Sequence, residues 1–307
     1  MEACLNPSAF LWKISMNTVT IGNFDGIHKG HLKVIERARS FGDTGLVCFE
    51  PIARQYFSDN SWRRRLTTVA ERSDILKKLG IENIHIIPFD AETAEKSPDR
   101  FLTELHEWEN FSRIVIGYDF HFGRNRSGTV EYLKRWCTSR EIDTIIVPPL
   151  ECDDGPVKSE RIRSLLEIGE LRSAEKFLGR HYSVTGVVSR GKGQGKLIGF
   201  PTLNVRVPGC KLLPEPGSYA GYVDFRGGFM PAAVFVPDSA TGPVEAHIVD
   251  YRAGDVYGSI MKVSFVEKLR NTASSSSTEE LRRLIAGDVE SVRQYTTMKE
   301  RTEDLER

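Results

Sequence analysis

The sequence predicts an α/β domain with a parallel sheet, followed by an antiparallel β-barrel domain with a C-terminal helix. From Thr18 to about Leu150, short apolar segments rich in β-branched residues alternate with amphipathic segments, a pattern typical of a parallel sheet covered by helices on both faces. After Gly179, β-type segments follow one another between Gly and Pro residues, without helices between them. This second pattern indicates an antiparallel sheet or a small barrel.

In the first part of the chain, strands and helices alternate. We expect strands at residues 18–21, 46–49, 84–89, 113–118 and 143–149, and helices at residues 32–39, 69–79, 98–108 and 129–139. A further helix, from Ser159 to about Leu178, closes this part. Ligands of parallel α/β sheets bind beyond the carboxyl ends of the strands, so we expect a site in the loops that follow them.

In the second part, a series of strands precedes one helix. The strands are expected at residues 182–188, 200–205, 219–225, 232–236, 244–251 and 260–266, and the helix at residues 278–293. Ser277 as N-cap, with Glu280 three residues later, fits a capping box at the start of that helix. Residues 294–307 are charged and are expected to fray.

The composition is that of an ordinary soluble protein with two domains. In 307 residues, 42 basic side chains balance 42 acidic ones, which argues against recruitment to nucleic acid or to a membrane by bulk charge. Five scattered cysteines without a C-x-x-C pair indicate reduced thiols and a cytoplasmic protein. No apolar run has the length of a membrane span. Residues 1–15 are expected to be a poorly ordered extension or the result of an upstream start codon.

The segment Gly22–His31, GNFDGIHKGH, lies at a strand–helix junction and is the main candidate for a phosphate site. Its glycines at 22, 26 and 30 let the backbone approach a ligand closely, and the helix start after Gly30 offers unpaired N–H groups. His28 and His31 lie three residues apart, so both imidazoles can face the same phosphate oxygens. An ordinary glycine-rich turn is the alternative. A zinc site is disfavoured, because no third ligand of suitable spacing stands nearby.

Two further loops are candidates for site residues. GYDFHFGRNRSG, residues 117–128, carries Asp119 and Arg124 at a strand end, with a plain surface turn as the alternative. GKGQGKLIGFPTLN, residues 191–204, is rich in Gly, and its backbone N–H groups together with Lys192 and Lys196 could cradle phosphates. This second loop lacks the P-loop spacing, and a hairpin turn is the alternative.

The segment GNFDGIHKGH resembles the H-x-G-H signature of the nucleotidylyltransferase superfamily, and residues 17–290 resemble the prokaryotic bifunctional riboflavin kinase/FAD synthetase family. The resemblance also rests on GYDFHFGRNRSG, FEP with Glu50, VKSERIR at 157–163, PTLN at 201–204 and VEAHIVDYRAGDVYG at 244–258. It implies a Rossmann-like nucleotidylyltransferase domain at residues 17–180 with FMN adenylyltransferase activity. It also implies a riboflavin kinase-like β-barrel domain with a C-terminal helix at residues 181–307.

For adenylyl transfer, the resemblance implies catalytic roles for His28, His31 and Arg163. The residues that it implies for binding ATP in this domain are Gly22, Asn23, Phe24, Asp25, Gly30, Asp119 and Ser159. In VKSERIR, Lys158 and Glu160 replace a serine and the threonine of the I-S-S-T-x-x-R signature. Glu160 would repel a triphosphate unless it points away, so we expect this departure to affect the rate of adenylyl transfer.

For the kinase, the resemblance implies that Gly191 and Lys196 bind the nucleotide and that Thr202 and Asn204 hold Mg²⁺ on the ATP phosphates, for which their oxygens are suited. Glu245 would accept the proton of the riboflavin 5′-hydroxyl. Two segments on the flavin side depart from the family. Residues 232–243 lack the Arg and the aromatic residue of a G-T-R-P-T-F-like loop, and residues 271–277 lack a Glu and a Phe.

The implied function is bifunctional flavin cofactor synthesis, with riboflavin converted to FMN and FMN to FAD with release of pyrophosphate. Both steps would use ATP and Mg²⁺, with ATP, riboflavin and FMN as ligands and no nucleic-acid or membrane partner. The departures leave two alternatives, a chain with only one of the activities and a non-catalytic flavin- or nucleotide-binding protein. Nucleotidyl transfer to another phosphate is disfavoured, because other members of the superfamily lack the barrel.

Overall fold

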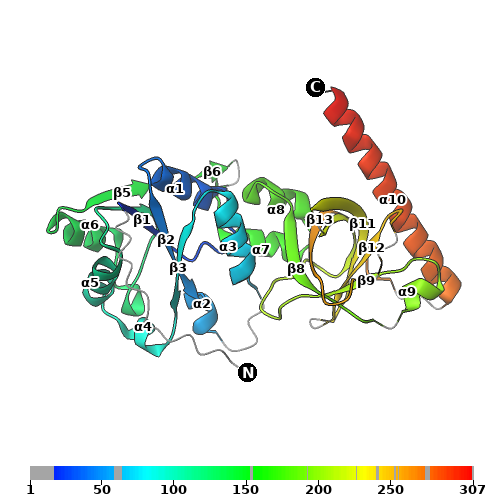
Figure 1. Ribbon diagram of the computed structural model, residues 1–307, viewed down its shortest axis with the longest axis horizontal. Helices are drawn as coiled ribbons and strands as arrows, with labels where there is room; N and C mark the ends of the chain where they lie inside the picture. The colour runs from blue at the N-terminus through cyan, green and yellow to red at the C-terminus, as the bar shows by residue number, and fades with distance from the viewer. Residues whose placement is uncertain are drawn as a thin grey trace. The chain divides into compact units, whose positions relative to one another are not determined.

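The computed structural model describes residues 17–58, 64–152, 155–191, 193–225, 227–239, 242–251, 254, 256–273 and 277–305. These residues form two compact units. The first comprises residues 17–24, 30–58 and 73–156, and the second comprises residues 25–29, 64–72 and those from Val157 onward. The second unit therefore includes two short segments that precede it in the sequence. Figure 1 labels most of the elements of both units.

The first unit is built on a parallel sheet with the strand order β3-β2-β1-β4-β5. Its strands are β1 (Thr18–Ile21), β2 (Thr44–Glu50), β3 (Asn83–Pro88), β4 (Arg113–Gly117) and β5 (Asp143–Val147). Every neighbouring pair is parallel, and all four residues of the central strand β1 are buried. The predicted parallel sheet is confirmed.

Helices cover both faces of this sheet. The elements around it are α1 (Lys29–Arg39), α2 (Ala53–Tyr56), α3 (Val69–Lys78), α4 (Ala91–Glu95), α5 (Pro98–Glu109), the 3₁₀ turn η1 (Arg124–Arg126), α6 (Val130–Thr138) and the hairpin β6 (Glu151–Cys152) and β7 (Gly155–Pro156). Val34 of α1 packs with Val115, whereas α5 and α6 share a core with Ile114 and Ile116. Successive strand residues point to opposite faces, so these contacts lie on the two sides.

The second unit contains a closed barrel with the strand order β10-β11-β12-β9-β8-β13. Its strands, all paired antiparallel, are β8 (Tyr182–Ser189), β9 (Leu203–Arg206), β10 (Gly217–Phe225), β11 (Gly228–Val236), β12 (Val244–Ile248) and β13 (Ile260–Asn271). Helix α10 (Thr278–Leu305) packs on the barrel through Val289 and Val292. Its N-cap is confirmed by the Glu280 N–H, which donates to Ser277 Oγ. Among the described residues, no helix is long and apolar enough to cross a membrane.

Three predicted helical features were wrong. The helix expected at 159–178 is two helices, α7 (Ser159–Glu167) and α8 (Leu171–Leu178), because Gly169 adopts a left-handed conformation with φ 75°. A short helix, α9 (Gln194–Leu197), interrupts the barrel strands. Helix α10 continues to Leu305 instead of ending at Arg293, since no Gly or Pro follows Gly287 within it to stop it.

A buried ion pair joins the segment 64–72 to the barrel. Lys211 Nζ lies 2.7 Å from Glu71 Oε2, and Glu71 Oε1 accepts a hydrogen bond from the Thr185 N–H at 2.7 Å. The Lys211 side chain is only 1% exposed, and its Nζ also donates to the Leu66 carbonyl. The positive charge of Lys211 and the negative charge of Glu71 therefore compensate each other inside the second unit.

Lys211→Met is expected to lower the free energy of unfolding by about 3–5 kcal/mol, because it leaves the Glu71 carboxylate buried without its cation. Urea unfolding measures this change. Lys78→Met is the matched control, since the Lys78 side chain is 66% exposed and should change stability by less than about 0.5 kcal/mol. Equal effects of the two substitutions would show that the buried pair has no such role.

Candidate functional site

The loop after β1 adopts an uncommon backbone conformation. Phe24 and Ile27 have positive φ angles of 47° and 38°, and Gly26 has φ 87°. A Cβ at Gly26 would lie 2.7 Å from Leu66 Cδ1, so this position requires glycine for space as well as for conformation. Helix α1 begins at Lys29, three residues earlier than predicted, and therefore includes Gly30 and His31.

Asp25 fixes this loop through its side chain. Its carboxylate accepts hydrogen bonds from the N–H groups of Leu66 and Thr67 at 3.0 Å, and it lies 2.6 Å from Arg163 Nη2. Asp25 is 2% exposed and Arg163 is 4% exposed. Arg163 also donates from Nε to the Arg64 carbonyl at 2.8 Å. In this geometry Asp25 and Arg163 bind each other, so both position the loop. Their predicted contacts with ATP and pyrophosphate stay predictions.

His28 is buried beside this pair. It is 5% exposed, and burial lowers its pKa to about 4, while the Asp25 carboxylate raises it by a smaller amount. Arg180 and Arg163 act in the same direction as burial. The imidazole is therefore neutral at pH 7, and it can donate a hydrogen bond without carrying a charge.

Stability is expected to fall between about pH 6.5 and about pH 4 because of His28. In this window the unfolded chain holds a proton on His28 that the folded chain does not, so stability rises with pH. The free energy of unfolding should fall by about 3 kcal/mol in total across this window, since one pKa unit corresponds to about 1.4 kcal/mol. Urea unfolding across this window should show a shallower dependence on pH in His28→Gln than in the wild type. Identical slopes would mean that His28 is not buried in its neutral form.

Most of the other predicted residues of this site lie in the first unit, whereas Ser159 lies in the second. The Gly22 N–H donates to the Val47 carbonyl at 3.0 Å, and the ring of Phe24 contacts the His31 ring edge-on at 5.3 Å. Asn23, just after β1, and Asp119, just after β4, are both exposed. Because β1 and β4 are parallel neighbours, these two residues follow strand ends on the same edge of the sheet.

The barrel brings together the residues predicted for phosphoryl transfer. Glu245 on β12 pairs directly with Asn204 on β9, and Thr202 Oγ1 lies 3.5 Å from Glu245 Oε2. A Cβ at Gly191 would lie 2.3 Å from Asn204 Nδ2, and one at Gly195 would lie 3.2 Å from Thr202 Oγ1. The glycine-rich loop therefore lies directly against both residues. Lys196 is exposed on α9, and Lys192 lies outside the described residues.

Glu245 has the properties of a proton acceptor. Burial raises the pKa of its carboxyl group, and the hydrogen bond from Thr202 opposes this shift. A carboxylate with a raised pKa holds a proton more readily, which suits a general base. The hydroxyl of Thr202 and the amide oxygen of Asn204 are hard oxygen donors, so this set of residues fits Mg²⁺.

Two family models match separate parts of the chain. A family model described as FAD synthetase matches residues 13–161, and one described as riboflavin kinase matches residues 178–296. A bifunctional riboflavin kinase/FMN adenylyltransferase of Pseudomonas fluorescens is 30% identical over 286 residues, which cover 89% of this chain and 91% of that protein. One of Haemophilus influenzae is 30% identical over 295 residues, which cover 90% and 93%.

The chain belongs to the bifunctional riboflavin kinase/FMN adenylyltransferase family. Both enzymatic domains of the family are present in it. A solved structure of a protein from Streptococcus pneumoniae, named a macrolide-efflux protein, shares 27% identity and a TM-score of 0.82 over 91% of this chain and 94% of that one. That similarity confirms the predicted architecture, an α/β domain followed by a barrel and a C-terminal helix.

Glu160, which departs from the family signature at 157–163, forms ion pairs with two arginines. It lies 3.1 Å from Arg64 Nη1 and 3.0 Å from Arg163 Nη1, and these arginines also pair with Glu167 and Asp25. Ser159 donates its hydroxyl proton to the Asp25 carbonyl at 2.9 Å. In this family member, Glu160 and Ser159 therefore help to fix the loop and α7. The predicted contact of Ser159 with ATP stays a prediction.

The two altered segments of the flavin side contact each other. Thr272 Oγ1 donates to Asp238 Oδ1 at 3.3 Å. Residues 240–241 and 274–276 lie outside the described residues. The contact shows that these short segments form part of one surface of the barrel unit.

A cluster of aromatic rings at the carboxyl ends of β2 and β3 was missed in the sequence. Tyr56 contacts Phe57 and Phe89 with ring centroids 5.2 and 5.3 Å apart, and Phe89 contacts Phe49 at 5.7 Å. Phe57 is 71% exposed. The sequence signal was the adjacent pair Tyr56-Phe57 shortly after the FEP segment, since neighbouring exposed apolar side chains can mark a ligand-binding surface.

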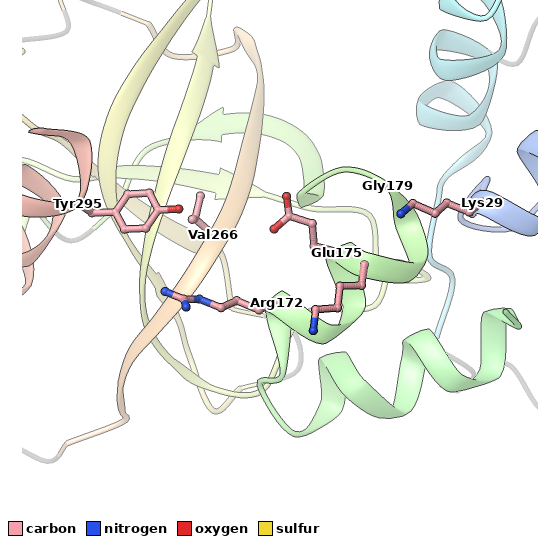
Figure 2. A pocket seen from close by; sticks show the side chains of 7 residues that line it. Lys29, Arg172, Glu175, Gly179, Val266 and Tyr295 are labelled. Atoms are coloured by element: carbon pink, nitrogen blue, oxygen red, sulfur yellow. The ribbon is translucent and has the colours of Figure 1, made fainter. Parts of the chain in front are cut away.

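Two cavities lie in the second unit. One, of about 410 Å³, is lined in part by residues that are close in sequence to the predicted kinase residues. Its lining consists of Gly199, Phe200, Pro201, His247, Ile248, Asp250, Tyr251, Ala286, Val289 and Arg293. The other, of about 440 Å³, lies among α8, β13 and α10 (Figure 2). It is lined by residues of mixed charge that include Lys29, Arg172 and Glu175. Only the first cavity contains neighbours of Thr202 and Glu245.

Proposed function

We propose that residues 181–307 phosphorylate riboflavin to FMN and that residues 17–180 adenylylate FMN to FAD. Each step uses one ATP. The observation that carries this proposal is the grouping of Thr202, Asn204 and Glu245 against the glycine-rich loop of the barrel. Family membership supports both substrates.

In the first step, the riboflavin 5′-oxygen attacks the γ-phosphorus of ATP. The new O–P bond forms as the bond from the γ-phosphorus to the bridging oxygen breaks, ADP leaves, and Glu245 accepts the hydroxyl proton. Gly191 and Lys196 bind the nucleotide. When bound at Thr202 and Asn204, Mg²⁺ would neutralise charge on the phosphate oxygens. The raised pKa of Glu245 supports its part in this step.

In the second step, a phosphate oxygen of FMN attacks the α-phosphorus of ATP, and pyrophosphate leaves with the electrons of the broken bond. His28, His31 and the loop N–H groups donate hydrogen bonds to the phosphates. A neutral His28, supported by its low pKa, can do this without a proton transfer. We assign the flavin ring of FMN to the cluster of Phe49, Tyr56, Phe57 and Phe89, because flat aromatic ligands stack on such rings.

We also propose that the protein is cytoplasmic. None of the described cysteines, Cys48, Cys137, Cys152 and Cys210, forms a disulfide, as expected in a reducing compartment. Cys4 lies outside the described residues.

Separate half-reactions test the proposal. FMN with ATP and Mg²⁺ should give FAD and pyrophosphate in equal amounts, and riboflavin with one equivalent of ATP should give FMN and ADP. Excess chelator should stop both reactions. Absence of FAD in the first reaction would leave a kinase alone, absence of FMN in the second would leave an adenylyltransferase alone, and flavin binding without either product would indicate a non-catalytic protein.

A further inference from the structure

A two-residue connection, Gly179-Arg180, contacts the loop that carries His28. Helix α8 ends at Leu178, Gly179 closes it in the left-handed conformation with φ 75° and ψ 13°, and β8 begins at Tyr182. The connection therefore links the last helix before the barrel to its first strand. None of the motifs in the sequence draws attention to it.

Arg180 holds the backbone of the loop with its guanidinium group. Nη2 donates to the Gly26 carbonyl at 2.5 Å, and Nη1 donates to the Ile27 carbonyl at 2.8 Å and to the Leu178 carbonyl at 3.4 Å. Burial lowers the pKa of Arg180 to about 10, so the group still carries its charge at neutral pH. One planar cation thus spans two consecutive peptide groups of the loop.

Gly179 contacts the side chain of Lys29, at the C-terminal end of the loop Gly26–Lys29. A Cβ at Gly179 would lie 3.3 Å from Cε and 3.4 Å from Cγ of Lys29, so the aliphatic stem of Lys29 lies over the glycine (Figure 2). Ile27 and Lys29 are the two neighbours of His28 in the chain. Gly179-Arg180 therefore holds the backbone on one side of His28 and a side chain on the other.

This arrangement determines where the loop donors point. A peptide group is planar, with its N–H directed opposite to its carbonyl. Holding the Gly26 carbonyl therefore orients the Ile27 N–H, and holding the Ile27 carbonyl orients the His28 N–H, both away from Arg180. Phe24 and Ile27 have left-handed backbone conformations, which cost about 1–2 kcal/mol each, so the loop needs such external contacts to keep its shape.

We propose that Arg180 is a positioning residue for adenylyl transfer, acting through the loop Gly26–Lys29 to orient the Ile27 and His28 N–H groups toward the ATP phosphates. The inference rests on the proposed adenylyltransferase function of this loop. Arg180 touches no substrate in this scheme, and its effect on the reaction passes entirely through the backbone.

The test compares Arg180→Met, Arg180→Lys and the control Arg172→Met in the full chain. Arg172 pairs with Glu267 through a side chain that is 69% exposed. We expect Arg180→Met to lower kcat/KM for FAD formation by about 10- to 100-fold, mainly through a higher KM for ATP, since small misplacements of binding groups have effects of this size. Arg180→Lys should retain more activity than Arg180→Met, because its ammonium group can donate to one of the two loop carbonyls. It should retain less than the wild type, because it lacks the planar guanidinium group that spans both carbonyls. Arg172→Met should match the wild type.

Two further readouts separate positioning from loss of fold. Riboflavin phosphorylation should stay within about twofold of the wild type in Arg180→Met, because the hydrogen bonds of Arg180 go to the Gly26, Ile27 and Leu178 carbonyls and not to a residue assigned to the kinase site. The pKa of His28, followed by NMR, should rise in Arg180→Met, since a cation that opposes protonation is removed. Wild-type FAD kinetics in Arg180→Met, or equal loss of both activities, would overturn the inference. If the wild type makes no FAD, the proposed function fails. In that case the His28 pKa still tests the role of Arg180, and an unchanged pKa in Arg180→Met would show that Arg180 does not act on the loop.

Discussion

Glu245→Gln is expected to lower kcat for riboflavin phosphorylation by about 100- to 10,000-fold, the usual range for removing a general base. The amide has almost the size of the carboxylate and can still pair with Thr202, but it cannot accept the proton of the attacking hydroxyl. Asn204 and the glycine-rich loop are untouched, so KM for ATP should change little. Initial rates of FMN formation, separated by chromatography, measure the effect.

The pH dependence of the same reaction gives a second readout. Burial raises the pKa of Glu245, so the acid limb of the kcat profile should lie at higher pH than for an ordinary glutamate. The residual rate of Glu245→Gln should lack this limb. Glu267→Gln is the matched control, since Glu267 pairs with Arg172 away from the site, and it should keep both rate and limb. A Glu245→Gln enzyme with wild-type kcat would contradict the assignment of the base.

His28→Ala and His31→Ala are each expected to abolish FAD formation, with a loss of at least about 100-fold, and to leave riboflavin phosphorylation largely unchanged. The magnitude is that of removing a donor aimed at developing negative charge. His28 is neutral and buried against Asp25 and Arg163, so its replacement removes a preorganised donor. Pyrophosphate release from FMN and ATP measures the loss.

The kinase reaction of the same variants is their internal control. Because it takes place in the barrel, a folded His28→Ala protein should convert riboflavin to FMN at the wild-type rate. His28→Ala buries no charge, which favours a folded variant. Equal loss of both reactions would mean that the activities are not divided between the two parts of the chain as proposed.

Local patterns were sufficient for most of the elements of the fold. The strand Thr18–Ile21 was predicted to the residue, because a short β-branched segment bounded by a polar residue and a glycine has few alternatives. The break at Gly169 was missed, since an isolated glycine within an amphipathic pattern is compatible with a continuous helix. In the fold, this glycine also lies against a residue distant in the chain, since a Cβ there would lie 2.8 Å from Glu215 Oε2.

The candidate site was predictable where the motif residues come from paired strands. Asn204 and Glu245 were identified separately, and the pairing of β9 with β12 places them opposite each other. The contacts of Asp25 with Arg163 and of Arg180 with the Gly26 carbonyl were not predictable, because they join segments that are more than a hundred residues apart in the chain. No local pattern specifies such a partner.

A time course with riboflavin, ATP and Mg²⁺, in which chromatography separates riboflavin, FMN and FAD, tests whether this chain catalyses both steps. FMN is expected to appear first and FAD to follow with a lag, with ADP and pyrophosphate released in step with the two products. In the same assay, His28→Ala should stop at FMN, and Glu245→Gln should leave riboflavin unreacted while still converting added FMN to FAD. Unreacted riboflavin in the wild type, together with no conversion of added FMN, would contradict both assigned activities.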